Sequence, residues 1–285
     1  MNKKFFVLTI CISAILAVAL SLLLYRAIAR APGQDVGPIL KAGVREAERP
    51  VQAESEYFIS ASNLEKRGDL LKAKEAYQKI IEKFPASNNI QKAEESLENL
   101  NIKILFSPTI TQGFLIYEVQ KGDTVTKIAK RFNTTKDYII NANGLTDGII
   151  KVGRKLKLPN TKFSIVVDKS QSILTLKSNG EILKTYKVAT GKNSSTPAGT
   201  FTITNKLIDP PWYPPAGGVI PAGDPKNVLG SRWLGISKPG YGIHGTIEPE
   251  SIGKSVTEGC VRMKNTDVEE LYTIIPEGTE VIIVD

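Results

Sequence analysis

The chain has 285 residues, 41% of them hydrophobic and 23% charged, which is the composition of a folded protein of two or three domains and excludes large-scale disorder. Its formal net charge of +8 fits an anionic neighbour. The lysines and arginines are scattered rather than gathered in blocks or a stripe, which argues against nucleic acid as the partner. A membrane surface, an anionic cell wall and ordinary solubility charge all remain compatible with this excess.

The N-terminus predicts export. Two lysines precede an uninterrupted apolar run from Phe5 to Leu24, and its twenty residues, at ~1.5 Å per helical residue, span the ~30 Å core of a bilayer. We interpret residues 1–4 as a cytoplasmic tail, 5–25 as a transmembrane anchor in the inner (cytoplasmic) membrane, and 26–55 as a linker. A signal sequence cleaved after Ala27-Ile28-Ala29 is the alternative, and both interpretations export the rest of the chain.

Cysteine usage singles out one thiol. The chain has two cysteines, and Cys11 lies within the apolar run, where it cannot reasonably pair with Cys260. Cys260 is therefore a lone thiol in a compartment that permits disulfides, which makes it a candidate reactive group. His244 is the single histidine, so no cluster of histidines and cysteines is available for a zinc site, and we expect no metal.

Residues 56–104 are predicted to form a small all-α unit. Tyr57, Ala61 and Leu64 form one apolar stripe at helical spacing, and a second stripe runs through residues 70–84 before a helix-ending proline. A third helix is expected over residues 88–100. The spacing resembles that of a single tetratricopeptide repeat (TPR). Because one repeat buries its own face poorly, the unit is either a docking module for a protein partner or a helical spacer.

Residues 115–159 have the βααβ order of a small α+β domain. The stretches YEVQKGDTVTKIAKRF, NANG and VGRKLKLP resemble the LysM module over its whole length. The resemblance implies binding of glycans that contain N-acetylglucosamine, in a shallow groove between the first strand–helix loop and the loop before the last strand. In this sequence we assign the groove to Gly122, Asp123, Thr124, Gly148, Ile149 and Ile150. A degenerate module kept as a spacer is the alternative.

Residues 162–285 predict a mainly-β domain with one helix. Four β-rich stretches between residues 163 and 205 are separated by turn residues, and a last strand covers 281–284. The one convincing helix runs over residues 266–274. A proline- and glycine-rich stretch, 209–230, is too long for a simple connection, so we expect it to cover a substrate.

His244 and Cys260 are the candidate catalytic pair. A thiol nucleophile needs a base and donors for an oxyanion. His244 lies between glycines in YGIHGT, which leaves space for a substrate, and Gly259 permits a tight turn that aims its own N–H and that of Cys260 into one concavity. Sequence spacing alone does not bring the two side chains together. A cysteine peptidase of another fold, with an Asn or Asp that orients the histidine, stays open at this point.

The stretch YGIHGTIEPESIGKSVTEGCVRMKNTDVEEL resembles the active-site segment of the L,D-transpeptidase (YkuD-type) family, and ATGKNSSTPAGTF and PPWYPPAGG extend the likeness over 162–285. The resemblance implies Cys260 as nucleophile, His244 as general acid/base, and Gly259 with Cys260 as backbone oxyanion donors. The residues from which we expect substrate contacts are Arg262, Tyr241, Gly245 and Thr246, with Arg262 facing a stem-peptide carboxylate or a local carbonyl.

One residue departs from the family pattern. Many members carry a second histidine where this chain has Glu258. A carboxylate beside Cys260 opposes formation of the thiolate unless Arg262 or a lysine balances its charge.

The implied reaction joins peptidoglycan stem peptides. Cys260 attacks the carbonyl between the third residue, a diamino acid, and the terminal D-Ala of a donor stem, and the resulting thioester passes to the amine of a neighbouring stem as a 3→3 cross-link. Water as acceptor makes the enzyme an L,D-carboxypeptidase. No cofactor is needed, and carbapenems are expected to acylate the thiol. The rival hypothesis is a non-catalytic cell-wall anchor; both place the protein in the periplasm or cell wall.

Overall fold

The computed structural model describes residues 53–214 and 217–285. The predicted cytoplasmic tail, the anchor and nearly all of the linker lie outside the described residues. Within the described part, no helix combines the length and the apolar character that a bilayer crossing requires. Residues 57–285 form one compact unit, which is described below.

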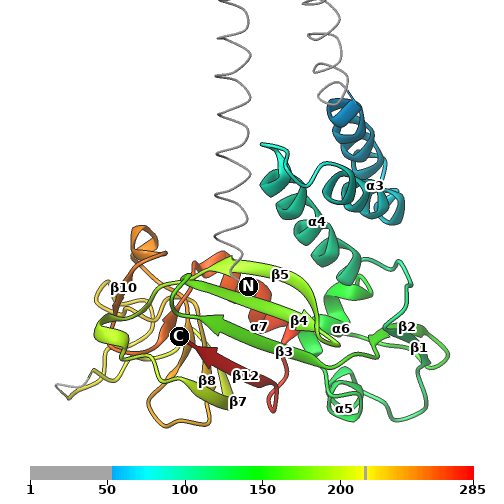
Figure 1. Ribbon diagram of the computed structural model, residues 1–285. Coiled ribbons are helices and arrows are strands. Elements are labelled where there is room, and N and C mark those ends of the chain that lie inside the picture. The colour runs from blue at the N-terminus through cyan, green and yellow to red at the C-terminus, as the bar shows by residue number, and fades with distance from the viewer. Residues whose placement is uncertain (1–52, 215–216) are drawn as a thin grey trace, which may run out of the picture. The chain divides into compact units, whose positions relative to one another are not determined.

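Three helices begin this unit: residues 53–66, α3 (Leu70–Lys83) and α4 (Ile90–Leu105) (Figure 1). They pack around a small core in which several members are alanines, so the helices approach closely: Ala61, Ala73, Tyr77, Ile80, Ala93, Leu100 and Ile104. The three helices fall where the apolar spacing predicts them, and α4 continues five residues beyond Leu100. The likeness to a TPR stays a prediction.

The expected βααβ order follows, as β1 (Phe114–Glu118), α5 (Val125–Arg131), α6 (Lys136–Ala142) and β2 (Lys155–Pro159). The strands β1 and β2 pair antiparallel. Threonine side chains cap both helices, since Thr124 Oγ1 accepts from Lys127 N (3.2 Å) and Thr135 Oγ1 accepts from Tyr138 N (2.8 Å).

A buried lysine joins this module to the helical unit. Lys157, in the middle of β2, is only 3% exposed. Its Nζ donates to the carbonyl oxygens of Ile104 (2.7 Å), Leu105 (3.3 Å) and Ser107 (2.8 Å) at the C-terminal end of α4. Helix-terminal carbonyls have no partner within the helix and carry partial negative charge, so an ammonium group satisfies both needs. Burial nevertheless lowers the pKa of Lys157 to about 8.

The C-terminal domain is built on an eight-stranded sheet of order β11-β9-β8-β7-β12-β3-β4-β5. Its strands are β3 (Phe163–Asp168), β4 (Ile173–Ser178), β5 (Glu181–Lys187), β7 (Gly199–Ile208), β8 (Arg232–Ile236), β9 (Gly242–His244), β11 (Val261–Arg262) and β12 (Glu280–Val284). A two-stranded sheet joins β6 (Thr190–Gly191) to β10 (Ser255–Thr257). The helix α7 (Asn265–Ile274) buries Val268, Leu271 and Ile274 and lies where residues 266–274 predict it.

The chain order places the catalytic candidates at one end of this sheet. The last strand, β12, inserts between β7 and β3 in the middle, antiparallel to the first and parallel to the second. The strands β8, β9 and β11 then continue the sheet to its edge. The mainly-β domain with one α-helix is therefore confirmed.

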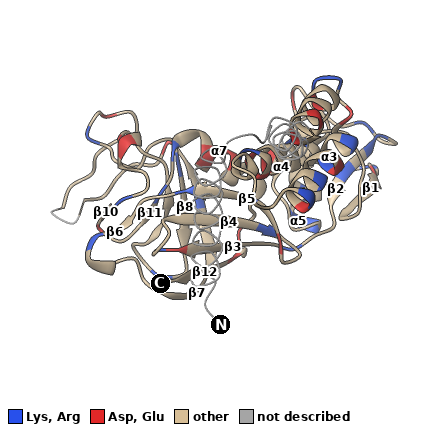
Figure 2. Cartoon of the chain, turned by 45° about the horizontal axis from the view of Figure 1, so that its top comes forward, with Lys and Arg blue, Asp and Glu red and all other residues tan. Residues whose placement is uncertain are grey.

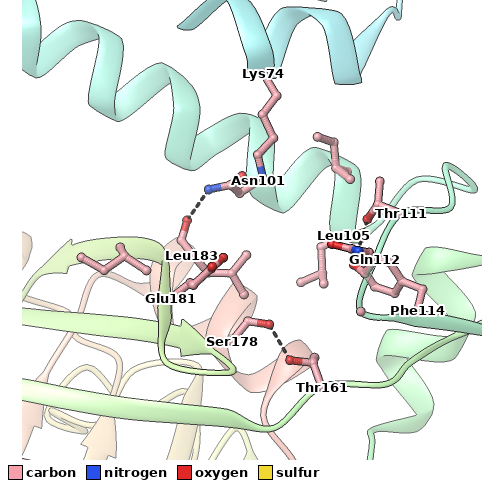
Figure 3. A pocket seen from close by; sticks show the side chains of 13 residues that line it. Lys74, Asn101, Leu105, Thr111, Gln112, Phe114, Thr161, Ser178, Glu181 and Leu183 are labelled. Atoms are coloured by element: carbon pink, nitrogen blue, oxygen red, sulfur yellow. Dashed lines mark hydrogen bonds between the residues drawn. The ribbon is translucent and has the colours of Figure 1, made fainter. Parts of the chain in front are cut away.

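A small cavity of about 140 Å³ marks where α4 meets the C-terminal sheet (Figure 3). Asn101 Nδ2 on α4 donates to Leu183 O on β5 (3.1 Å), and the hydroxyls of Thr161 and Ser178 lie 2.6 Å apart across the start of the domain. These polar contacts sit at the rim of the junction, whereas Leu105 and partly buried Phe114 belong to the apolar core that continues from the βααβ module into the sheet.

We expect Lys157→Met to destabilise the protein by about 1–3 kcal/mol, because it removes a buried charged donor shared by three carbonyls, although Ser107 Oγ still donates to Ile104 O and Tyr138 Oη to Leu105 O. The matched control is Lys155→Met, in the same strand but exposed, which should change stability by less than about 0.5 kcal/mol. Urea unfolding of the two variants beside the parent chain measures the difference. Equal stabilities for both variants would show that the lysine cap contributes nothing.

Candidate active site

Strand pairing brings His244 and Cys260 into adjacent strands. His244 ends β9, whose neighbours are β8, with Trp233 opposite His244, and β11, with Arg262 opposite His244. Cys260 directly precedes β11, and its Sγ donates to Gly240 O (3.7 Å) in the turn before β9. The two residues, sixteen apart in sequence, thus belong to one edge of the sheet.

A backbone carbonyl orients the imidazole of His244. Nδ1 lies 2.7 Å from Gly245 O, and because a carbonyl only accepts, Nδ1 carries the hydrogen and Nε2 keeps its lone pair. His244 is only 3% exposed. This burial lowers its pKa to about 4, with the Arg262 charge acting in the same direction. At neutral pH the ring is therefore an uncharged base, and the orienting role of an Asp or Asn side chain is taken by the Gly245 carbonyl.

The thiol of Cys260 is the neutral partner of this base. Burial raises the pKa of the Cys260 thiol, while a hydrogen bond with the Gly242 backbone and the charge of Arg262 act against that rise. In a catalytic pair of this kind, a thiol that is neutral at rest loses its proton during the attack rather than before it.

Thr257 holds the turn that presents Cys260. Its Oγ1 donates to Cys260 O (2.6 Å) and accepts from Gly259 N (3.2 Å). The Gly259 N–H can therefore take the expected oxyanion role only after its 3.2 Å hydrogen bond to Thr257 Oγ1 breaks. Only glycine fits at 259, because its φ is +133° and a Cβ would lie 2.6 Å from Tyr241 Cε1.

Arg262 does not face the substrate space. It is buried, and its Nη1 donates to Glu248 Oε2 (2.7 Å) and Ser251 Oγ (2.9 Å). A guanidinium enclosed in this way is not available to a stem-peptide carboxylate, and this corrects the expectation from its place after Cys260. Its partner is a side-chain carboxylate that the sequence places fourteen residues earlier.

Glu258 has a different counter-ion. Its carboxylate pairs with Lys192 Nζ at 2.7 Å, and its side chain is 74% exposed. An exposed, paired carboxylate exerts little field on a neighbouring thiol. The lysine that balances Glu258 is Lys192.

The other residues expected to contact the substrate lie in different surroundings. Tyr241 packs against Gly259 beside the nucleophile, whereas Gly245 acts through the carbonyl that orients His244. Thr246 is buried, and its N–H donates to Asn265 Oδ1 (2.9 Å) at the start of α7. Asn265 also accepts from Ser231 N (3.2 Å). The sequence analysis did not identify Asn265 and Thr257, whose side chains hydrogen-bond to the backbone next to His244 and at Cys260.

A cavity of about 310 Å³ opens beside Cys260. Residues 210–213 and Leu229 supply one wall, and β7 and β8 supply another; the lining includes Leu207, Pro210, Trp212, Tyr213, Trp233 and Cys260. Asn227 holds this wall together, since its Nδ2 donates to Pro210 O (2.8 Å) and Pro221 O (3.1 Å). The cavity is mainly apolar and has the size of a small-molecule site.

In the loop at residues 122–124, which is expected to bind glycan, most polar side-chain groups are engaged in hydrogen bonds within the loop. Asp123 accepts from Tyr117 Oη (2.6 Å) and Gln120 N (2.9 Å), and Thr124 caps α5, so both side chains build the loop. Gly122 adopts a φ of +85° in the same turn. On the opposite loop Gly148 turns the chain, and Ile149 is 63% exposed beside Ile150.

Among the residues that the structure describes, no group of three or more His, Cys, Asp or Glu side chains is placed to hold a metal ion.

Comparison with known proteins matches residues 162–283 to the L,D-transpeptidase catalytic domain (YkuD) and residues 117–159 to the LysM domain. The chain is 38% identical over 177 residues to the putative L,D-transpeptidase YkuD of Bacillus licheniformis, covering 59% of this chain and 98% of that protein. It is 41% identical over 127 residues to the putative L,D-transpeptidase YqjB of Bacillus subtilis, covering 42% and 70%.

Solved structures match more weakly. The catalytic domain of the Enterococcus faecium L,D-transpeptidase matches over 43% of this chain and 97% of that one, at 24% identity and a TM-score of 0.37. An L,D-transpeptidase from Mycobacterium smegmatis matches over 47% of this chain and 65% of that one, at 21% identity and a TM-score of 0.39.

Burial of neutral His244 predicts a stability that falls in acid. The folded pKa of about 4 lies below the ordinary 6.5, so the unfolded chain binds the proton first and stability is lost as pH falls from 6.5 towards 4. Between pH 7.5 and 4.5 this single group costs roughly 2.5 kcal/mol. His244→Gln, which cannot titrate, should lose that much less stability over the same interval in urea unfolding. Identical pH slopes for the two proteins would contradict a buried, neutral His244.

Proposed function

Because the chain belongs to the L,D-transpeptidase family and carries a LysM domain before its catalytic domain, we propose that it cross-links peptidoglycan stem peptides through an acyl-enzyme on Cys260. One observation carries this proposal. A neutral imidazole, oriented by the Gly245 carbonyl, lies on the strand beside the thiol, and the thiol opens into a cavity large enough for part of a peptide.

In the first half-reaction, Nε2 of His244 takes the proton of Cys260 as the sulfur attacks the carbonyl carbon between the diamino acid and D-Ala. The oxyanion that forms is bound by the N–H groups of Gly259 and Cys260. His244 then returns the proton to the nitrogen of D-Ala as the C–N bond breaks. D-Ala leaves, and the tripeptide remains on Cys260 as a thioester.

In the second half-reaction, the side-chain amine of a neighbouring stem attacks the thioester and gives its proton to His244. The C–S bond breaks, the thiol regains a proton, and a 3→3 amide results. Water as the attacking group gives a tripeptide instead. The wall of Pro210, Trp212 and Tyr213 over the thiol supports transfer, because an apolar enclosure disfavours entry of bulk water before the acceptor binds.

The LysM domain supplies the second element of the proposal, which is targeting to the wall. Nine Lys and Arg residues and four Asp and Glu residues lie between 117 and 159, so this domain holds most of the formal charge excess of the chain. Figure 2 shows this concentration of positive charge around α5, β1 and β2. Glycan bound there, with Gly122, Asp123, Thr124, Gly148, Ile149 and Ile150 as the groove, holds stem peptides at high local concentration near Cys260.

The two domains indicate a role outside the cytoplasm, in the cell wall. We propose residues 5–25 as an anchor in the cytoplasmic membrane and 26–55 as the linker. Residues 56–104 are proposed as a TPR-like unit open to a protein partner, 115–159 as the glycan-binding domain and 162–285 as the catalytic domain. The sequence of these segments supports this division.

Incubation of the purified protein with tetrapeptide muropeptides, followed by mass analysis, tests the reaction. We expect 3→3 dimers and free D-Ala with the parent chain, none with Cys260→Ala, and parent-like yields with Cys11→Ala, which removes the other cysteine. A carbapenem should add its mass once to the parent chain and to Cys11→Ala, but not to Cys260→Ala. Tripeptides without dimers would identify the enzyme as an L,D-carboxypeptidase. If no product depended on Cys260, the non-catalytic wall anchor would be the remaining hypothesis.

Targeting is tested at Ile149, the exposed large apolar residue of the proposed groove. Ile149→Asp should weaken binding to insoluble sacculi about tenfold, because loss of one apolar contact costs about 1.4 kcal/mol. The control is Ile182→Asp, which places the same charge at an equally exposed apolar residue of β5. Equal binding by the two variants in co-sedimentation would remove the loop at 148–150 from the glycan site.

A further inference from the structure

A second aromatic ring lies against the catalytic base. Trp233 stands directly opposite His244 in the antiparallel pair β8–β9, so both side chains point to the same face of the sheet. Their rings are stacked, with centroids 6.1 Å apart and planes inclined by 21°. Trp233 also lines the cavity that contains Cys260. The indole is therefore both a wall of the substrate space and a cover on one face of the imidazole.

The indole is itself held in place. Its Nε1 donates to Asn205 Oδ1 (3.1 Å) on β7, the next strand of the sheet. Gly235 and Gly242, register partners across β8 and β9, leave the room that it needs. A Cβ at Gly242 would lie 2.7 Å from Trp233 Cη2, and one at Gly235 would lie 2.9 Å from Nε1 and 2.1 Å from Asn205 Oδ1. Three strands thus form a slot for one ring.

The hydrogen bond to Gly245 O does not by itself fix the base. It sets the direction of Nδ1 within the plane of the imidazole, and a second backbone hydrogen bond, with Leu229, acts on the same side chain, but neither bond covers a face of the ring. A flat partner stacked on the ring restricts its tilt, and with it the direction of the Nε2 lone pair. A base whose lone pair is fixed accepts a proton from one position only. This orientation increases the rate of general-base catalysis.

We propose that Trp233, anchored by Asn205 in the slot of Gly235 and Gly242, is the positioning residue that fixes the plane of His244 and keeps water from its face. This rests on the proposed role of His244 as the base for Cys260.

Few charged groups lie close enough to His244 to mask the effect of Trp233 on its pKa. The charge that acts on the pKa of His244 is that of Arg262, which lies opposite it on β11 and is paired with Glu248. Arg232, next to Trp233, lies on the other face of the sheet with its guanidinium 5.5 Å from the ring of Tyr272. The helix α7 turns buried apolar residues such as Val268 and Leu271 inward. Removal of the indole should therefore act on His244 mainly through hydration and tilt.

The single histidine makes the test direct, because the protein has one imidazole signal to follow by NMR. In Trp233→Leu, water reaches the ring, so the pKa of His244 should rise by about one unit or more from about 4 towards 6.5. Alkylation of Cys260 by iodoacetamide at pH 7 should slow about tenfold because the lone pair is no longer fixed. Trp233→Phe keeps a flat partner but loses the hydrogen bond to Asn205, so it should recover only part of both properties.

The matched control is Tyr272→Leu, which removes an aromatic ring beside Arg232 on the other face of the sheet and outside the cavity that contains Cys260. We expect it to leave the imidazole titration and the alkylation rate as they are. The proposal is overturned if Trp233→Leu behaves like Tyr272→Leu in both measurements. Should Trp233→Leu not fold, Asn205→Ala decides, because it frees the intact indole; an unchanged titration and alkylation rate there would overturn the proposal equally.

These readouts need no peptidoglycan. A parent chain that forms no Cys260-dependent product from muropeptides would refute the proposed function while the titration and alkylation still tested Trp233. Conversely, normal cross-linking by the parent chain together with unmoved titrations in the variants would refute only the role of Trp233.

Discussion

The three-residue strand β9 is the constraint on which the site depends. Its pairing with β8 sets Trp233 over His244, and its pairing with β11 sets Arg262 beside His244 and Cys260 just before it. The residue after β9 then turns its carbonyl back to Nδ1. A shift of one residue in either register would send the imidazole to the other face of the sheet, so the alignment of a few backbone hydrogen bonds determines whether base and nucleophile meet.

Burial of the pair sets its electrostatics. Partial burial raises the pKa of the thiol and burial lowers that of the imidazole, so both groups are neutral at rest. The one buried cation nearby, Arg262, is offset by Glu248, and the exposed carboxylate next to the nucleophile is offset by Lys192. Each of these two charges therefore has a partner of opposite charge. In the proposed reaction, the charge changes on the thiol–imidazole pair.

Much of this architecture could be predicted from the sequence, because periodicity is a local property. The βααβ order and the helix near residues 266–274 lie where their patterns place them, and the β-rich stretches fall on strands, with β5 beginning four residues before the predicted 185. Contacts across strands are not local. Nothing in the sequence around Arg262 identifies Glu248 as its partner, and the engagement of the Gly259 N–H by Thr257 depends on the turn. Asn265 and Trp233 were missed for the same reason, since their roles follow from register rather than from neighbours in sequence.

The helix α7 connects the catalytic edge to the module before it. At its first residue, Asn265 binds the N–H groups of Ser231 and Thr246, which flank β8 and β9. At its last turn, Lys206 Nζ donates to Tyr272 O (2.6 Å) and Ile275 O (2.7 Å), a half-buried lysine cap similar to the one that Lys157 provides for α4. Between these ends, Thr135, the cap of α6 in the LysM domain, donates through its hydroxyl to Thr273 O. One helix thus contacts both the segment that carries His244 and the domain proposed to hold glycan. A rigid connection of this kind favours the proposed reaction, because a stem peptide gains local concentration only if its glycan is held at a fixed reach from Cys260.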